Sequence, residues 1–244
     1  MTGVLLYLSP RGKLLRLSYK LSRHHKTTQK FMSLANVIDH TILKPDCTLA
    51  DIEKVCKEAL NHHFKAVCIP PFYVKEAKQV LENSAVKVST VIGFPSGYSS
   101  TPAKVEEIKR ALDDGADEFD VVINICAVKN GNWNFVQNDI ESMTRAVHLK
   151  GRVIKIILET GLLTKEEIEK VCSICINSGV NFVKTSTGFN GPGASEEVVS
   201  FLRSILPPTI KIKASGGIRT KEAAAAMIRA GAERIGTSAG PELL

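Results

Sequence analysis

The stretch NSGVNFVK, residues 177–184, holds the pattern that decides the fold, a glycine between a helical run and a short apolar strand. The residues before it, EEIEKVCSICINSG, repeat apolar side chains at the spacing of one helix face. DDGADEFD at 113–120 and RAGAERIG at 229–236 repeat the same arrangement. Glycine can adopt the left-handed conformation that ends a helix. The three stretches therefore predict helices that each lead through one glycine into a strand.

Outward from these junctions, short β-branched runs alternate with longer helical runs from residue 36 onward. The expected strands are 36–40, 65–70, 86–94, 118–124, 152–159, 181–186, 209–215 and 234–238. The expected helices are 48–62, 71–83, 101–114, 134–149, 164–178, 195–205 and 220–230. Eight such units predict an α/β fold, a single-domain (β/α)8 TIM barrel over residues 32–244, with an open doubly wound sheet as the alternative. Because the chain stops at Leu244, the eighth helix should be short or missing.

The net charge of +7 is concentrated at one end of the chain. Residues 1–31 contain no acidic residue and seven basic ones, Arg11, Lys13, Arg16, Lys20, Arg23, Lys26 and Lys30. The 32 basic residues less these seven leave 25, which equal the 25 acidic residues. We expect residues 1–31 to be a basic, disordered N-terminal extension, either a transit peptide or a mis-assigned start before MSLANVIDHT. The expected location is the cytoplasm, or an organelle if the extension is a transit peptide.

The cysteines and the apolar runs narrow the class of protein further. Six cysteines lie at irregular spacings, which is typical of a reduced intracellular protein. The only C-x-x-C pair, Cys172 and Cys175, falls on one helix face without a second pair, so core packing is favoured over zinc. Arg11 and Lys13 interrupt the only early apolar run, so no membrane segment is expected. We expect neither a metal nor a cofactor.

Ionisable residues lie within the expected strands or at their ends, and barrels of this type place their chemistry at the strand ends. They are Asp39, Asp120, Lys155, Glu159, Lys184 and Lys213. Lys184 and Lys213 end neighbouring strands, and repulsion between two ammonium groups favours a free amine that can attack a carbonyl. Asp120 and Lys155 would supply a proton relay. The alternatives are a lysine that extends its ammonium group to solvent and a simple Asp120–Lys155 salt bridge, and the spacing leaves Lys211 and Lys213 undecided.

Two glycine-containing stretches follow the last two strands, ASGGIRT at 214–220 and IGTSAG at 235–240. Backbone amides at such loops bind anions, and the loops after strands seven and eight commonly hold phosphate in barrels. The expected phosphate-binding residues are Gly188, Gly216, Gly217, Gly236 and Ser238. Plain turns are the alternative for each loop alone. Cys68 is expected to be a small residue in the wall of the site, because no Cys, His and acid spacing supports a thiol mechanism.

Seven motifs in order give the chain a strong resemblance to the deoxyribose-phosphate aldolase family over residues 34–240. They are DHTILKPDCT (39–48), AVCIPPFYV (66–74), VIGFPSG (91–97), EFDVVIN (118–124), KIILETG (155–161), FVKTSTGF (182–189) and IKASGGIRT (212–220). The resemblance implies cleavage of 2-deoxy-D-ribose 5-phosphate to acetaldehyde and glyceraldehyde 3-phosphate without a cofactor. It also implies that Lys184 forms a Schiff base, Lys213 is the second lysine, and Asp120 moves protons. From the residues themselves we expect Asp39, Lys155 and Cys68 to support them.

The chain departs from the family pattern at a few positions. Cys126 stands where the family often has Gly, and Phe189 stands where some members carry Lys. The family is often dimeric, so a homodimer is implied, with small phosphosugar and aldehyde substrates as the other partners. Two rival readings stay open, a Schiff-base barrel aldolase for another phosphorylated sugar, and a nucleic-acid-binding protein that uses residues 1–31. We expect no nucleic acid and no membrane as partners.

Overall fold

The computed structural model describes residues 2–8, 14–20 and 34–244, in two units, Met1–Met32 and Ser33–Leu244. In the first unit, β1 (Thr2–Leu8) pairs antiparallel with β2 (Leu14–Lys20). The sequence led us to expect disorder throughout this extension, and these two strands differ from that expectation because VLLYL and LLRL are rich in apolar residues. A lone two-stranded hairpin is at best marginally stable in water. The rest of the extension lies outside the described residues.

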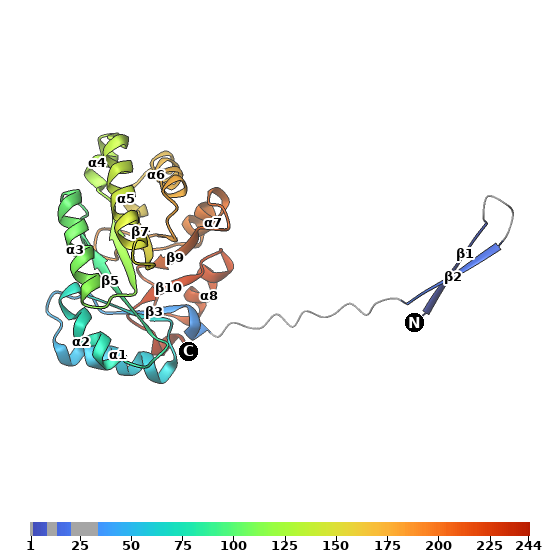
Figure 1. Ribbon diagram of the computed structural model, residues 1–244, viewed down its shortest axis with the longest axis horizontal. Helices are drawn as coiled ribbons and strands as arrows, with labels where there is room; N and C mark the ends of the chain where they lie inside the picture. The colour runs from blue at the N-terminus through green and yellow to red at the C-terminus, as the bar shows by residue number, and fades with distance from the viewer. Residues whose placement is uncertain (1, 9–13, 21–33) are drawn as a thin grey trace. The chain divides into compact units, whose positions relative to one another are not determined.

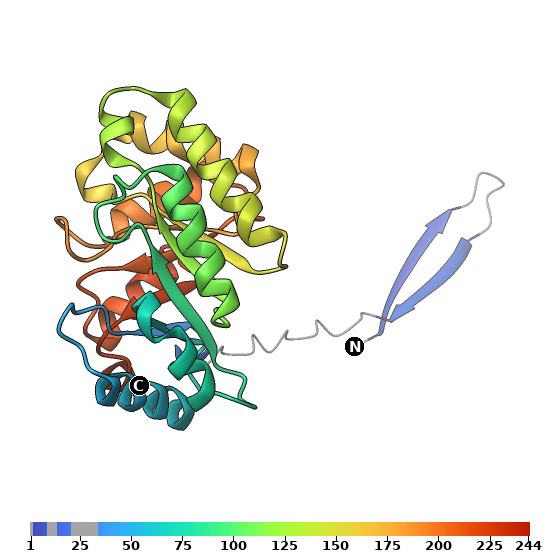
Figure 2. The same ribbon diagram turned by 60° about the vertical axis from the view of Figure 1, so that its left-hand side comes forward.

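The second unit is a closed barrel of eight parallel strands (Figures 1 and 2). The strands are β3 (Ile38–Thr41), β4 (Ala66–Ile69), β5 (Lys87–Ile92), β6 (Glu118–Val122), β7 (Val153–Ile157), β8 (Phe182–Lys184), β9 (Lys211–Ser215) and β10 (Arg234–Thr237). Strand β10 pairs with both β9 and β3, which closes the ring. This closure confirms the TIM barrel and excludes the open doubly wound sheet.

Helices surround the barrel, as Figure 1 shows. The α-helices are α1 (Leu49–His62), α2 (Val74–Val80), α3 (Thr101–Asp113), α4 (Ile125–Lys129), α5 (Trp133–His148), α6 (Lys165–Ser178), α7 (Glu196–Ile205) and α8 (Lys221–Arg229). The short 3-10 helices are η1 (Leu34–Val37), η2 (Pro71–Tyr73), η3 (Thr160–Leu162) and η4 (Pro241–Leu243). The seven expected helices are present, although η2 and α2 share 71–83. The sequence missed α4, a single turn capped by Asn124.

The helix–glycine–strand junctions form as predicted. Gly115, Gly179 and Gly231 have φ angles of 102°, 68° and 113°. After β10 the described chain forms only η4. The sequence predicted a short or missing helix at this place, after the eighth strand of the barrel. Among the described residues, none of the helices has the length and apolar character that crossing a membrane requires.

Alternation along the strands separates two environments. Phe119 and Val121 of β6 belong to the hydrophobic core between the strands and the helices. Successive side chains of a strand point to opposite faces, so Glu118 and Asp120 point into the barrel. Both carboxyl groups are buried. The barrel interior therefore contains charged groups, and the packing of the helices holds them in place.

Candidate active site

A cavity of 220 Å³ lies where the last residues of the strands meet the following loops. Its wall includes Lys184, which ends β8, and Ser215, which ends β9. The five expected phosphate-binding residues, Gly188, Gly216, Gly217, Gly236 and Ser238, also line it. The structure thus brings the expected nucleophile and the expected anion-binding loops to one cavity at the carboxyl end of the barrel.

Lys184 and Lys213 meet at one carboxylate oxygen. Nζ of Lys184 donates to Oδ2 of Asp120 at 2.8 Å, and Nζ of Lys213 donates to the same oxygen at 2.7 Å. The two lysines pair directly across β8 and β9. Lys211 is exposed and lies over the Phe182 ring. The structure therefore resolves what the spacing left open, because Lys213 is the inward-facing neighbour of Lys184.

Lys155 holds the other oxygen of Asp120. Its Nζ donates to Oδ1 of Asp120 at 2.8 Å and to Oγ of Ser89 at 3.1 Å, and it lies 2.7 Å from Oε2 of Glu118. Ser89 Oγ also donates to Oδ1 of Asp120 at 3.2 Å. Burial would raise the pKa of Asp120, but Lys155, Lys184 and Lys213 hold it well below its ordinary value. Asp120 is therefore an ionised acceptor.

Arg234, the first residue of β10, completes the cluster. Its Nε donates to Oδ1 of Asp39 at 2.8 Å, and its terminal nitrogens donate to Glu118 at 2.6 and 3.3 Å. Asp39 in turn lies 2.5 Å from Nζ of Lys213. Burial would lower the pKa of Lys213, but Asp120 and Asp39 raise it above its ordinary value. Lys213 is therefore a permanently protonated neighbour of Lys184.

The seven buried groups of this cluster are Asp39, Glu118, Asp120, Lys155, Lys184, Lys213 and Arg234. When all are ionised they carry four positive charges and three negative ones. A buried excess positive charge is costly. Cys68 places its Sγ 3.9 Å from Oδ2 of Asp120, and burial raises the pKa of its thiol. Cys68 is therefore a buried neutral residue beside Asp120, and its expected place in the wall of the site stays a prediction.

The glycine loops offer backbone donors to the cavity. Among residues 34–244, the N–H groups of Gly188, Gly216, Gly217 and Ser238 have no protein acceptor. Gly216 and Gly217 have φ angles of 90° and 79°, a region that favours glycine. Lys44 and Arg219, which the sequence did not single out, line the same cavity. Unpaired N–H groups beside two cations suit a phosphate group.

Two loops approach each other closely at the phosphate side. A Cβ at Gly193 would lie 2.1 Å from the carbonyl oxygen of Gly216, so neither loop could accept a side chain there. Ala194 N–H donates to the carbonyl oxygens of Ser215 and Gly216. Gly236 makes room instead, since a Cβ there would lie 3.1 Å from Cε of Lys213. Gly236 therefore leaves space for Lys213, and its expected role as a phosphate donor stays a prediction.

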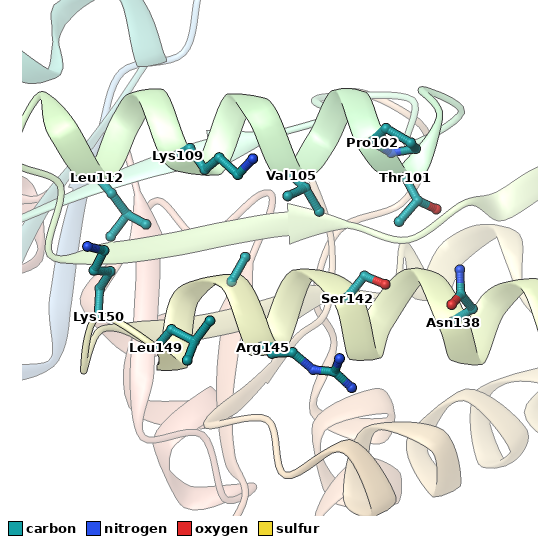
Figure 3. Close-up of a pocket in the computed structure, with 11 residues that line it drawn as sticks. Thr101, Pro102, Val105, Lys109, Leu112, Asn138, Ser142, Arg145, Leu149 and Lys150 are labelled. Carbon is teal, nitrogen blue, oxygen red and sulfur yellow. The ribbon is translucent and has the colours of Figure 1, made fainter.

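A larger cavity, of 600 Å³, lies between α3 and α5 (Figure 3). Val105 and Leu112 of α3 and Leu149 after α5 line it, together with Lys109 and Arg145. None of the buried charged groups of the barrel reaches this cavity. The reactive groups therefore belong to the smaller cavity at the barrel mouth.

Sequence reasoning missed Glu118, Arg234 and Gly193. A signal existed for Glu118, because it precedes Asp120 by two residues on the same strand and must share its face. The same alternation in β10 could have placed Arg234 inward. Gly193 had no comparable signal, since its role depends on the approach of a loop distant in sequence.

A barrel whose mouth joins paired lysines to a cavity lined by unpaired backbone N–H groups suits covalent chemistry on phosphorylated carbonyl compounds. A family model described as DeoC/LacD family aldolase matches residues 33–242. The chain therefore belongs to this family of aldolases, which are carbon–carbon lyases.

Curated and solved relatives agree with the family assignment. A deoxyribose-phosphate aldolase of Thermococcus gammatolerans is 50% identical over 215 residues, which cover 87% of this chain and 96% of the relative. A putative deoxyribose-phosphate aldolase structure from Coccidioides immitis superposes with a TM-score of 0.83 at 44% identity, covering 86% of this chain and 83% of that one. A deoxyribose phosphate aldolase from Aeropyrum pernix, described as a tetramer, gives a TM-score of 0.81 at 32% identity, with 86% and 88% covered.

Proposed function

We propose that the chain reversibly cleaves 2-deoxy-D-ribose 5-phosphate to acetaldehyde and D-glyceraldehyde 3-phosphate through a Schiff base on Lys184. The observation that carries the proposal is the shared oxygen of Asp120, to which Lys184 and Lys213 both donate beside a cavity lined by free backbone N–H groups. Lys184 contacts one carboxylate, whereas Lys155 and Lys213 each contact more than one. Lys184 is therefore the amine that can leave the cluster to react.

In the first step, the free amine of Lys184 attacks C1 of the open-chain sugar. A carbinolamine forms, and its loss of water gives an iminium ion in which nitrogen carries the positive charge. The ionised carboxylate of Asp120, 2.8 Å from Nζ, is placed to accept the proton that the amine gives up. Lys213 remains charged and keeps Asp120 ionised.

In the second step, the C3 hydroxyl loses its proton and the C2–C3 bond breaks. The bonding electrons move into the iminium, which gives an enamine of acetaldehyde and releases glyceraldehyde 3-phosphate. Protonation of the enamine at C2 restores an iminium ion, and water hydrolyses it to acetaldehyde and the free lysine. We propose that Asp120, with a water molecule, carries these protons. The phosphate group would bind at Gly188, Gly216, Gly217 and Ser238.

The direct test is an assay of the purified chain with 2-deoxyribose 5-phosphate, in which released glyceraldehyde 3-phosphate is measured by a coupled dehydrogenase. Ribose 5-phosphate and fructose 1,6-bisphosphate serve as alternative substrates. We expect cleavage of the deoxy sugar alone and no cleavage by Lys184→Met. Preferred cleavage of another phosphorylated sugar would instead support the rival aldolase reading.

We further propose that the aldolase domain spans residues 32–244 and does not need residues 1–31. A chain that starts at Met32 should keep full activity. If the basic extension instead serves nucleic-acid binding, the full chain should bind a duplex oligonucleotide in a salt-dependent way and the shorter chain should not. We expect no such difference at physiological salt.

The assembly and the location of the chain are also proposals. We propose a homodimer in the cytoplasm, with an organelle as the alternative location. Light scattering of the purified protein measures the assembly, and a tetramer, as described for the Aeropyrum pernix relative, would contradict the dimer. Microscopy of full-length and shortened chains fused to a fluorescent protein would separate the two locations.

A further inference from the structure

One buried carboxylate lies beside the site but outside the charged cluster. Glu159 follows β7 and is 1% exposed. Within residues 34–244, no lysine or arginine forms an ion pair with it. Its backbone adopts φ 58° and ψ 58°, a left-handed conformation that is unfavourable for a non-glycine residue. A strained, buried acid without a cation needs another set of partners.

Those partners come from the loop after β8. The Thr187 N–H donates to both carboxylate oxygens of Glu159, at 3.1 and 3.3 Å, and the Thr187 hydroxyl donates to Oε2. The side-chain amide of Asn190 donates to the same oxygen at 3.5 Å and to the carbonyl oxygen of Pro95 at 2.9 Å. Glu159 therefore fixes the loop at both ends of the segment 187–190.

Gly188, between these fixed points, faces the cavity with a free N–H. On one side Thr187 is bound to Glu159, and on the other the Phe189 N–H donates to the Thr187 hydroxyl oxygen at 3.1 Å. The next residue after Glu159 adds a backbone bond, from the Thr160 N–H to the carbonyl oxygen of Thr185 at 2.9 Å. The orientation of the Gly188 peptide thus depends on contacts that converge on Glu159.

We propose that Glu159 is a positioning residue that gives the site its preference for phosphorylated over unphosphorylated sugars, an inference that rests on the proposed function. It holds the Gly188 N–H ready for the phosphate, so binding does not have to order the loop. A sugar without phosphate makes no use of this loop and gains nothing from it. The Lys184 reaction itself does not involve Glu159.

The test compares kcat/KM for 2-deoxyribose 5-phosphate and for 2-deoxyribose in the full chain. The variants are Glu159→Ala, which removes the acceptor, and Glu159→Gln, which keeps one acceptor oxygen. The matched control is Asp139→Asn on α5, because Asp139 is also a buried carboxylate that accepts a threonine hydroxyl, from Thr101 at 2.7 Å. Asp139 lies outside the cavity at the barrel mouth.

We expect Glu159→Ala to lower the ratio of the two kcat/KM values about tenfold, as for the loss of one charge-assisted hydrogen bond, mainly through KM of the phosphorylated sugar. Glu159→Gln should lower it less. Inhibition by inorganic phosphate should weaken in parallel. Asp139→Asn should melt at a lower temperature but keep the wild-type ratio.

Two results would separate the possible failures. If the wild-type chain cleaves 2-deoxyribose 5-phosphate but Glu159→Ala keeps its ratio, or lowers both kcat/KM values equally, the positioning role is wrong. If the wild-type chain cleaves neither sugar, the proposed function itself is wrong. If Glu159→Ala unfolds at too low a temperature for the assay, Glu159→Gln takes its place. An unchanged ratio and unchanged phosphate inhibition in Glu159→Gln would then overturn the inference.

Discussion

Lys184 and Lys213 donate to the same oxygen of Asp120, at 2.8 and 2.7 Å, from directly paired positions on neighbouring strands. The two ammonium groups differ in their other contacts, because Lys213 also lies 2.5 Å from Asp39 and Lys184 opens to the cavity. This asymmetry separates their roles. In the proposed mechanism Lys213 is held as a cation, and Lys184 is the amine that meets the substrate.

Lys213→Met should lower kcat about 10²-fold or more, the contribution typical of a positioned acid–base group. The reason is that Asp120 loses one of its three lysine donors and the charge balance of the cluster changes. Lys211→Met is the matched control, since Lys211 is two residues away on the same strand but exposed. Steady-state kinetics measure both. Equal losses in the two variants would remove Lys213 from this role.

Arg234→Met should destabilise the fold by about 3–5 kcal/mol, because it leaves Asp39 and Glu118 buried without their shared cation. Adding Glu118→Gln removes one of the two carboxylates that lose Arg234 and should recover part of the loss. Urea unfolding of the single and double variants gives the coupling energy. Strictly additive losses would show that Arg234 and Glu118 do not interact in solution.

Gly216→Ala should raise KM for the phosphorylated sugar about tenfold, as for the loss of one good hydrogen bond. A Cβ there would lie 2.8 Å from Cα of Gly193 and force the two phosphate-side loops apart. Gly179→Ala is the control, because Gly179 also has a positive φ but no atom lies within 4 Å of its added Cβ. Both variants should lose stability, and only Gly216→Ala should change KM. The same KM for both variants would contradict phosphate binding by the loop that contains Gly216.

Stability should fall in acid because of three carboxyl groups. Burial would raise the pKa of Asp39, Glu118 and Asp120, but the neighbouring cations hold each below its ordinary value. The unfolded chain therefore binds protons near pH 4, where the folded chain does not, and stability decreases as pH falls further. The urea midpoint should be nearly level from pH 7 to about pH 5 and then decrease.

Asp120→Asn should show a shallower decrease, since it lacks one of these carboxyl groups. The exposed Glu169→Gln should follow the wild-type curve. A wild-type midpoint that rises in acid would contradict the pKa directions given for the cluster.

The barrel could be predicted from the sequence because its signals are local. The alternation of short apolar runs with helical ones repeats along the barrel, and glycines such as Gly179 mark three of the junctions, so neither signal needs a distant partner. Helix α4 was missed because five residues are too few for a helical period. The hairpin of β1 and β2 was missed because the basic composition outweighed its apolar runs.

The site was predictable where a charged residue occurs within an apolar strand or at its end, as at Lys184, Lys213 and Asp120. The resemblance added the choice between Lys211 and Lys213, which share one strand face, and in the structure Lys211 is exposed at the start of β9 whereas Lys213 is buried. Arg234 and Gly193 act through contacts with residues far away in the sequence, and only the folded chain brings those together. The role of Glu159 depends in the same way on the loop after β8.

The most direct test of the account is reduction of the full chain with borohydride in the presence of acetaldehyde, followed by peptide mapping. An iminium ion on a lysine is reduced to an N-ethyl amine, which marks the reacting residue. We expect one N-ethyl group on Lys184, absent without acetaldehyde and absent in Lys184→Met. A label on Lys213 or Lys155 in place of Lys184, or no labelled lysine at all, would contradict it.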